Sequence, residues 1–171
     1  MGTALFLSLR AAHVLLAAVW VGATVFTSIL LMPVIEGSGP IGGQLMQNLE
    51  KKGMTAFFAA IGGTTVLTGI YLYWRFTGGF DPTISASHAG MAFGIGGVAG
   101  ILAVIIGGSV IGRSSRKVLA LMEQLPKASE AQKIALMKEA DVLRGRMKTF
   151  GTLVLVLQLI ALLTMAVGHY I

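Results

Sequence analysis

Hydrophobic residues along this chain fall into four long runs separated by polar segments. The first run has no Asp, Glu, Lys or Arg between Arg10 and Glu36. Because an α-helix rises about 1.5 Å per residue, such a run can cross a hydrocarbon layer about 30 Å thick. The pattern predicts membrane spans at residues 5–32, 54–74, 88–111 and 149–170. We therefore expect an all-α fold, an integral membrane four-helix up-down bundle.

Polar and small side chains share one face of the first span, because they recur at spacings of four and three residues. We expect this face to line the inside of the bundle. Its only ionisable member is His13, and an ionisable side chain within a span usually has a functional role. The face consists of His13, Ala17, Trp20, Thr24, Thr27 and Leu31.

Turn-forming residues predict where the spans end. Pro33 and the GSGPIGG segment after it are expected to stop the first helix, with a short helical turn at residues 44–52 leading into the second. Ser85 and Ser87 are candidate N-caps for the third span.

Residues 113–148 form a long polar segment between the third and fourth spans. Ser129 and Gln132 have the spacing of a capping box, which opens a helix. We expect both spans to extend beyond the bilayer as a helical hairpin, with its charges on a solvated face.

Charge predicts the orientation. The hairpin segment carries nine of the thirteen basic residues, and Lys51 and Lys52 lie on the same side of the membrane, whereas Arg10 and Arg75 lie on the other. Basic residues gather on cytoplasmic loops. We therefore expect a cytoplasmic hairpin and both termini outside, in a bacterial cytoplasmic membrane.

Composition agrees with this class. The chain is 55% hydrophobic and 12% charged, with a mean hydropathy of +0.82, whereas soluble domains carry about 25% charged residues. Four spans nearly use up the 171 residues, so we expect a single domain. The loops account for the net charge of +6 without nucleic acid as a partner. Because there is no cysteine, a bound metal would need His, Met or carboxylate ligands.

Two further polar or small features lie inside the later spans. Gln158 falls near the middle of the fourth span, where an amide needs a hydrogen-bonding partner. The third span is rich in glycine, which lets helices pack closely or leaves room for a planar ring. These glycines are Gly90, Gly94, Gly96, Gly97, Gly100, Gly107 and Gly108.

His13, His88 and His169 are the only histidines, and each falls at the outward end of its span. Two of them could hold haem iron, either His13 with His88 or His13 with His169, and Arg10 and Arg75 could pair with the propionates. Alternatively, the three imidazoles could bind copper or zinc. The glycine-rich span and the arginines favour haem.

The segment from His13 to Gly22, with Trp20 seven residues after the histidine, resembles the first helix of a superfamily of small four-helix membrane proteins. This superfamily includes copper-resistance D-type proteins and HemJ-type protoporphyrinogen oxidases, and the segment from Thr68 to Tyr71 resembles a step in their second helix. The resemblance implies a haem b site with His13 as an axial ligand, or a link to copper. HemJ-type enzymes also carry a lysine in their third span, which this chain lacks.

These observations lead to one main hypothesis and two alternatives. The main one is a membrane haem b protein for electron transfer, or for a redox reaction near the outer face, with quinone or another redox partner. The first alternative is a copper- or zinc-binding or transport-associated protein without haem. The second is a structural subunit of a homo-oligomer or larger membrane complex.

Overall fold

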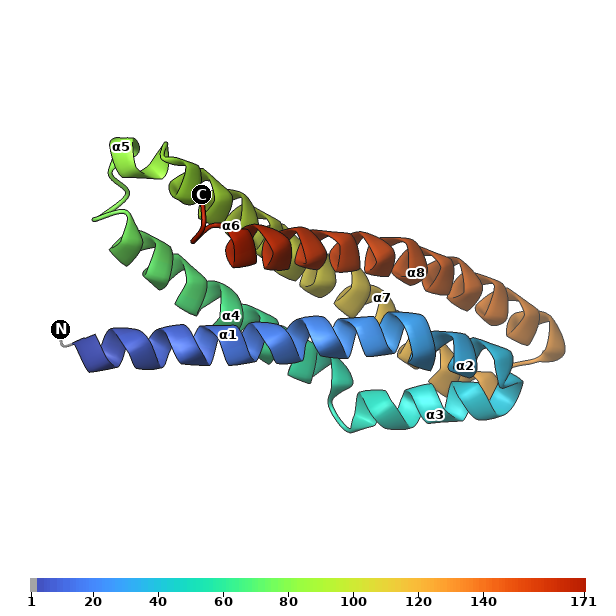
Figure 1. The fold of residues 1–171 in the computed structure, drawn as a ribbon. Helices are drawn as coiled ribbons and strands as arrows, with labels where there is room; N and C mark the ends of the chain where they lie inside the picture. The colour runs from blue at the N-terminus through green and yellow to red at the C-terminus, as the bar shows by residue number, and fades with distance from the viewer. Residues whose placement is uncertain (1–2) are drawn as a thin grey trace.

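The computed structural model describes residues 3–171, and within them all regular structure is helical. Four helical stretches are long and apolar enough to cross a membrane (Figure 1). They are Ala4–Gly37, Met54–Phe76, His88–Lys127 and Glu130–Val167. The predicted all-helical class and the four candidate spans are therefore confirmed.

The first stretch continues past Pro33, where we expected it to stop. It consists of α1 (Thr3–Phe26), a π-helical turn η1 (Thr27–Leu31) and α2 (Met32–Gly37). Pro33 falls in the first turn of α2, where a missing N–H costs little. The wide turn before it bonds the Met32 N–H back to the Thr27 carbonyl, so the chain absorbs the proline without breaking.

The glycine-rich segment after α2 was also predicted wrongly as a turn. The chain reverses at Ser38, with Gly39 at a φ of +53°, and α3 (Gly39–Lys51) begins at once. The backbone of Gly42 lies directly against the carbonyl of Ile35, where a Cβ would collide with it. This glycine therefore allows two short helices to pack tightly, and α3 includes most of the helical turn expected at residues 44–52.

The remaining helices are α4 (Met54–Phe76), α5 (Pro82–Ser85), α6 (His88–Ile106), the π-helical turn η2 (Gly107–Ile111), α7 (Gly112–Gln124), the 3₁₀ turn η3 (Leu125–Lys127) and α8 (Glu130–Val167). The Ser87 hydroxyl accepts a hydrogen bond from the Gly90 N–H and caps α6, as predicted, whereas Ser85, the other candidate, is the last residue of α5. The capping box of Ser129 and Gln132 at the start of α8 is confirmed.

The long helices pack side by side. α1 packs mainly on α4, α6 packs on both α4 and α8, and α8 also contacts α1. The buried core takes one residue from each long helix: Trp20, Ile61, Ala103 and Val154. The start of α1, the C-terminal residue and α5 lie at one end of the bundle, here called the terminal end (Figure 1). The opposite end, which holds α3 and the α7–α8 connection, is called the hairpin end.

Polar contacts fasten the hairpin end. The Glu50 carboxylate at the end of α3 accepts hydrogen bonds from Thr55 of α4 at 2.8 Å and from Ser115 of α7 at 2.5 Å. Lys148 of α8 lies 3.2 Å from Glu36 of α2. These contacts join α2 to α8 and α3 to α4 and α7, in addition to the buried apolar residues Ile35, Leu121 and Ala140 of this end.

Candidate functional site

His13 lies inside the bundle, with 9% of its surface exposed. Its Nδ1 is 3.0 Å from the Thr65 carbonyl oxygen and 3.0 Å from Thr68 Oγ1, both on α4. A carbonyl oxygen only accepts hydrogen bonds, so Nδ1 carries the proton and donates it. The Nε2 atom of a neutral His13 is then an unprotonated lone-pair donor, and no described residue hydrogen-bonds to it. Histidines that bind metals are commonly oriented in this way.

Two glycines of α4 receive the two rings of α1. A Cβ added to Gly69 would lie 2.9 Å from Cε1 of His13, and one added to Gly62 would lie 2.9 Å from the Trp20 ring. The rings are seven residues apart on α1, and the glycines are seven residues apart on the antiparallel α4. The spacing of His13 and Trp20 therefore matches a pair of glycine sockets.

The inward face predicted for α1 is confirmed at three of its six positions, which are buried, whereas the other three are half-buried. The buried ones are His13, Trp20 and Thr24. Sequence reasoning missed their partners Thr65, Gly62 and Gly69. The matching seven-residue spacing of the two glycines was the available signal.

His169 and Arg10 lie together at the terminal end. Arg10 Nη2 is 2.6 Å from Nε2 of His169, and the imidazole packs edge-on against the Phe93 ring, with 5.1 Å between ring centroids. A guanidinium only donates, so Nε2 of His169 is the acceptor. The structure thus brings two predicted site residues together, close to His13 because Arg10 lies one turn before it on α1.

His88 and Arg75 are placed differently. Both are exposed, His88 at the first residue of α6 and Arg75 in the last turn of α4. Neither has a hydrogen bond or ion pair with another residue of the described chain. Within residues 3–171, no group of three or more His, Asp or Glu side chains lies close enough together to hold a metal ion. The imidazoles of His13, His88 and His169 therefore do not form one cluster in this structure.

Gln158 is the most deeply buried amide side chain, with 1% of its surface exposed. Neither its Nε2 nor its Oε1 has a hydrogen-bonding partner among the described residues. The sequence predicts that an amide at this depth needs a partner. The packing of α8 instead leaves both polar atoms unpaired.

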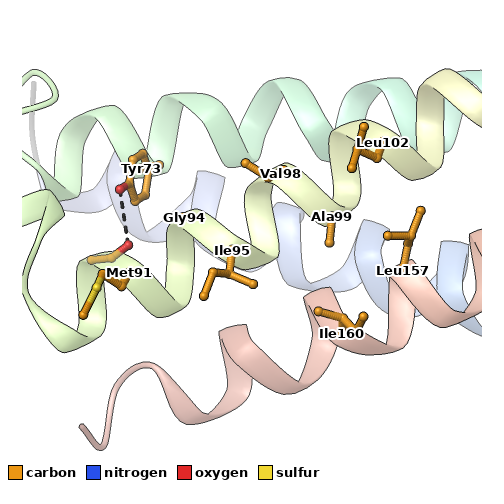
Figure 2. A pocket seen from close by; sticks show the side chains of 10 residues that line it. Tyr73, Met91, Gly94, Ile95, Val98, Ala99, Leu102, Leu157 and Ile160 are labelled. Carbon is orange, nitrogen blue, oxygen red and sulfur yellow. Dashed lines mark hydrogen bonds between the residues drawn. The ribbon is translucent and has the colours of Figure 1, made fainter.

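An apolar groove runs along the outer side of α6 (Figure 2). The Tyr73 hydroxyl bridges from α4 to the Gly90 carbonyl, at 3.2 Å, at one end of the groove. Exposed aliphatic side chains of α6 and α8 line the rest, as on a helix surface that faces lipid. The lining residues include Met91, Ile95, Val98, Leu102, Leu157 and Ile160.

Comparison of the chain with models of protein families, with curated proteins and with solved structures found no match.

Proposed function

We propose that this chain is an integral membrane protein that binds haem b and transfers electrons, or carries out a redox reaction, near its terminal end. In this proposal the bundle is up-down, the terminal end faces outward, and the basic hairpin of α7 and α8 is cytoplasmic. The excess of Lys and Arg in residues 113–148 supports this orientation.

The observation that carries the proposal is the anchoring of His13. The Thr65 carbonyl and the Thr68 hydroxyl fix the imidazole through Nδ1, which leaves the Nε2 lone pair available to a metal. An imidazole that is held in place loses little conformational freedom when it binds iron, and its anchored N–H makes it a better electron donor. His13 is therefore the residue that would hold the haem iron.

The surrounding residues fit the rest of a haem. Arg10, one turn closer to the terminal end, would pair with a propionate, and Arg75 is the other basic residue on that side. Trp20 would close the hairpin side of the site, because its ring fills the socket at Gly62. The sequence-based hypothesis gives the second axial position to His88 or His169. Bound haem would supply reversible one-electron chemistry, and the protein tunes its potential through ligands and burial.

A quinone within the bilayer is the partner that we propose for electron exchange. The lipid-facing groove on α6 and the surrounding apolar surface allow a hydrophobic carrier to approach the bundle. A partner protein at the hairpin end is the alternative that fits a subunit of a larger complex.

The test is to purify the full chain after expression with ample haem and record its absorption spectrum. We expect a Soret band and a reduced α-band, both lost in His13→Ala. Thr24→Ala is the matched control, because Thr24 is also a buried polar residue of α1 but bonds only to its own helix. If the wild-type protein is colourless but retains copper or zinc, the haem proposal is wrong and the site binds a bare metal ion. If it retains neither and copurifies with other membrane subunits, the structural alternative is favoured.

A further inference from the structure

Met165 lies on α8 at a close contact with α6. A Cβ added to Gly96 of α6 would lie 2.6 Å from Thr164 Oγ1, 3.1 Å from Met165 Cγ and 3.2 Å from the Ala161 carbonyl oxygen. The missing side chain at Gly96 is therefore what lets Met165 pack against the α6 backbone. Its thioether is half-buried and makes no hydrogen bond with a described residue.

The packing of α4 against α6 shows at which depth Met165 lies. Gly100 of α6 faces Val66 of α4, and the Tyr73 hydroxyl, further toward the terminal end, reaches Gly90 (Figure 2). One turn from Gly100 toward the terminal end is Gly96. One turn from Val66 in the same direction is Ile70, next to Gly69. Gly96 and Gly69 are therefore at the same depth in the bundle.

This register places four residues in one layer across the bundle, one from each long helix. They are His13 of α1, which packs on Gly69 of α4, and Met165 of α8, which packs on Gly96 of α6. Two members of the layer are metal-binding residue types, and the other two have no side chain. These helix contacts put Met165 level with His13.

We propose that Met165 supplies the second axial ligand, opposite His13. The inference rests on the proposed haem site and names one of its residues. A thioether sulfur is an established haem ligand beside histidine, and it carries no proton that must leave. It also needs no hydrogen bond when buried without iron, so the apoprotein carries no unpaired polar group at this position.

The two histidines considered from the sequence are less well placed. His88 is exposed at the first residue of α6. Nε2 of His169 already accepts a hydrogen bond from Arg10, and its ring is held against Phe93. In this arrangement Arg10 and His169 frame the outer edge of the site. A His–Met pair also gives a higher reduction potential than two histidines, which suits a site that accepts electrons.

The test is Met165→Leu in the full haem-loaded protein, because leucine keeps the volume and removes the sulfur. We expect the far-red charge-transfer band of ferric thioether-ligated haem in the wild type and its loss in the variant. The variant should keep its Soret band through His13, and its ferrous form should bind carbon monoxide far faster. Met137→Leu is the matched control, since Met137 is an exposed methionine of the same helix, about seven to eight turns from Met165, and it should change none of these signals.

A second variant, Met165→His, tests the same ligand if the Met165→Leu protein cannot be produced in folded form. Met165→His should hold haem with a bis-imidazole spectrum and a lower reduction potential than the wild type. A wild-type bis-imidazole spectrum that survives Met165→Leu but is lost in His169→Ala or His88→Ala would overturn the assignment of Met165 and leave the haem proposal standing. A wild type that takes up no haem would overturn both.

Discussion

The α1–α4 contact and the α6–α8 contact both depend on glycine, but they use it differently. On α4, Gly62 and Gly69 accept the flat rings of Trp20 and His13. On α6, Gly96 brings one backbone close to another, with the Ala161 carbonyl 3.2 Å from the position of a Cβ. The first contact selects ring-shaped partners, and the second selects a short distance between helices.

The difference has a chemical consequence. The ring contact is also tied by hydrogen bonds from Nδ1 of His13 to Thr65 and Thr68, so it fixes one imidazole in one orientation. The α6–α8 contact depends on van der Waals packing, as is usual for small residues between helices in lipid. One side of the bundle is therefore built to orient a side chain, and the other side to hold two helices together.

Trp20→Ala should have the largest effect, because it empties the Gly62 socket in the centre of the core. We expect a loss of about 3–5 kcal/mol in the free energy of unfolding, as for other large-to-small core changes. Unfolding by SDS titration in mixed micelles would measure it. Leu15→Ala is the control, since Leu15 is 67% exposed on the same helix. Equal losses in the two variants would contradict a socket at Gly62.

Gly96→Val should break the α6–α8 contact by overpacking. The added carbons would meet Thr164, Met165 and the Ala161 carbonyl, so we expect a destabilisation of about 1–3 kcal/mol. Gly97→Val next to it is a strict control, because nothing lies within 4 Å of a Cβ at Gly97. Thermal unfolding of both variants in detergent should separate them, and a similar melting temperature for the two would argue against close approach at Gly96.

Gln158→Leu should stabilise the apoprotein. The change replaces an amide whose two polar atoms are buried and unpaired with an apolar side chain of similar size. An unsatisfied buried polar group costs about 1–3 kcal/mol, so we expect a gain of about that size in the same SDS titration. Gln124→Leu is the control, because that amide is exposed and donates to the Ala120 carbonyl. A loss of stability on changing Gln158 would mean that its amide has a partner.

Thr68→Val should have the smallest effect of these changes, and it tests directly whether the α1–α4 contact orients His13. It removes one of the two acceptors that orient His13 while keeping the shape of the side chain. Loss of such an outer-shell partner costs about 10–100-fold in affinity, and we expect the lower end for haem because the Thr65 carbonyl remains. Haem titration of the apoprotein would measure it. Thr64→Val should leave affinity unchanged, since that hydroxyl is exposed and bonds to Ala60 of its own helix.

The sequence predicts the four spans because each needs a long apolar run to cross the membrane. It predicts the inward face of α1 because the polar residues recur there at helical spacing. It also predicts the caps at Ser87 and Ser129, because these depend on local spacing. It does not predict that Pro33 is absorbed, because that depends on the π-helical turn η1 before it. Nor does it predict that α3 begins at Gly39, because that start depends on the close fit of Gly42 against Ile35. That fit is a tertiary contact.

Within the candidate site, His13 could be recognised from the sequence and its surroundings could not. Its main anchor is the backbone carbonyl of Thr65, and every residue type has such a carbonyl. The depth of Met165 relative to His13 depends on how α4, α6 and α8 slide past one another. Residue counts within a span do not determine that register.

The π-helical turns η1 and η2 suggest how the protein could change over evolutionary time. Each turn contains about one residue more than an α-helical turn, so its five residues rotate the chain about as far as four α-helical residues. Losing one residue from η1 would therefore restore an ordinary α-helical turn and keep Glu36 beside Lys148, and the same loss in η2 would keep Ser115 beside Glu50. His13, Trp20 and Gly96 come before these turns and would stay in place. The two turns can thus gain or lose a residue over evolutionary time while the contacts at both ends of the bundle are kept.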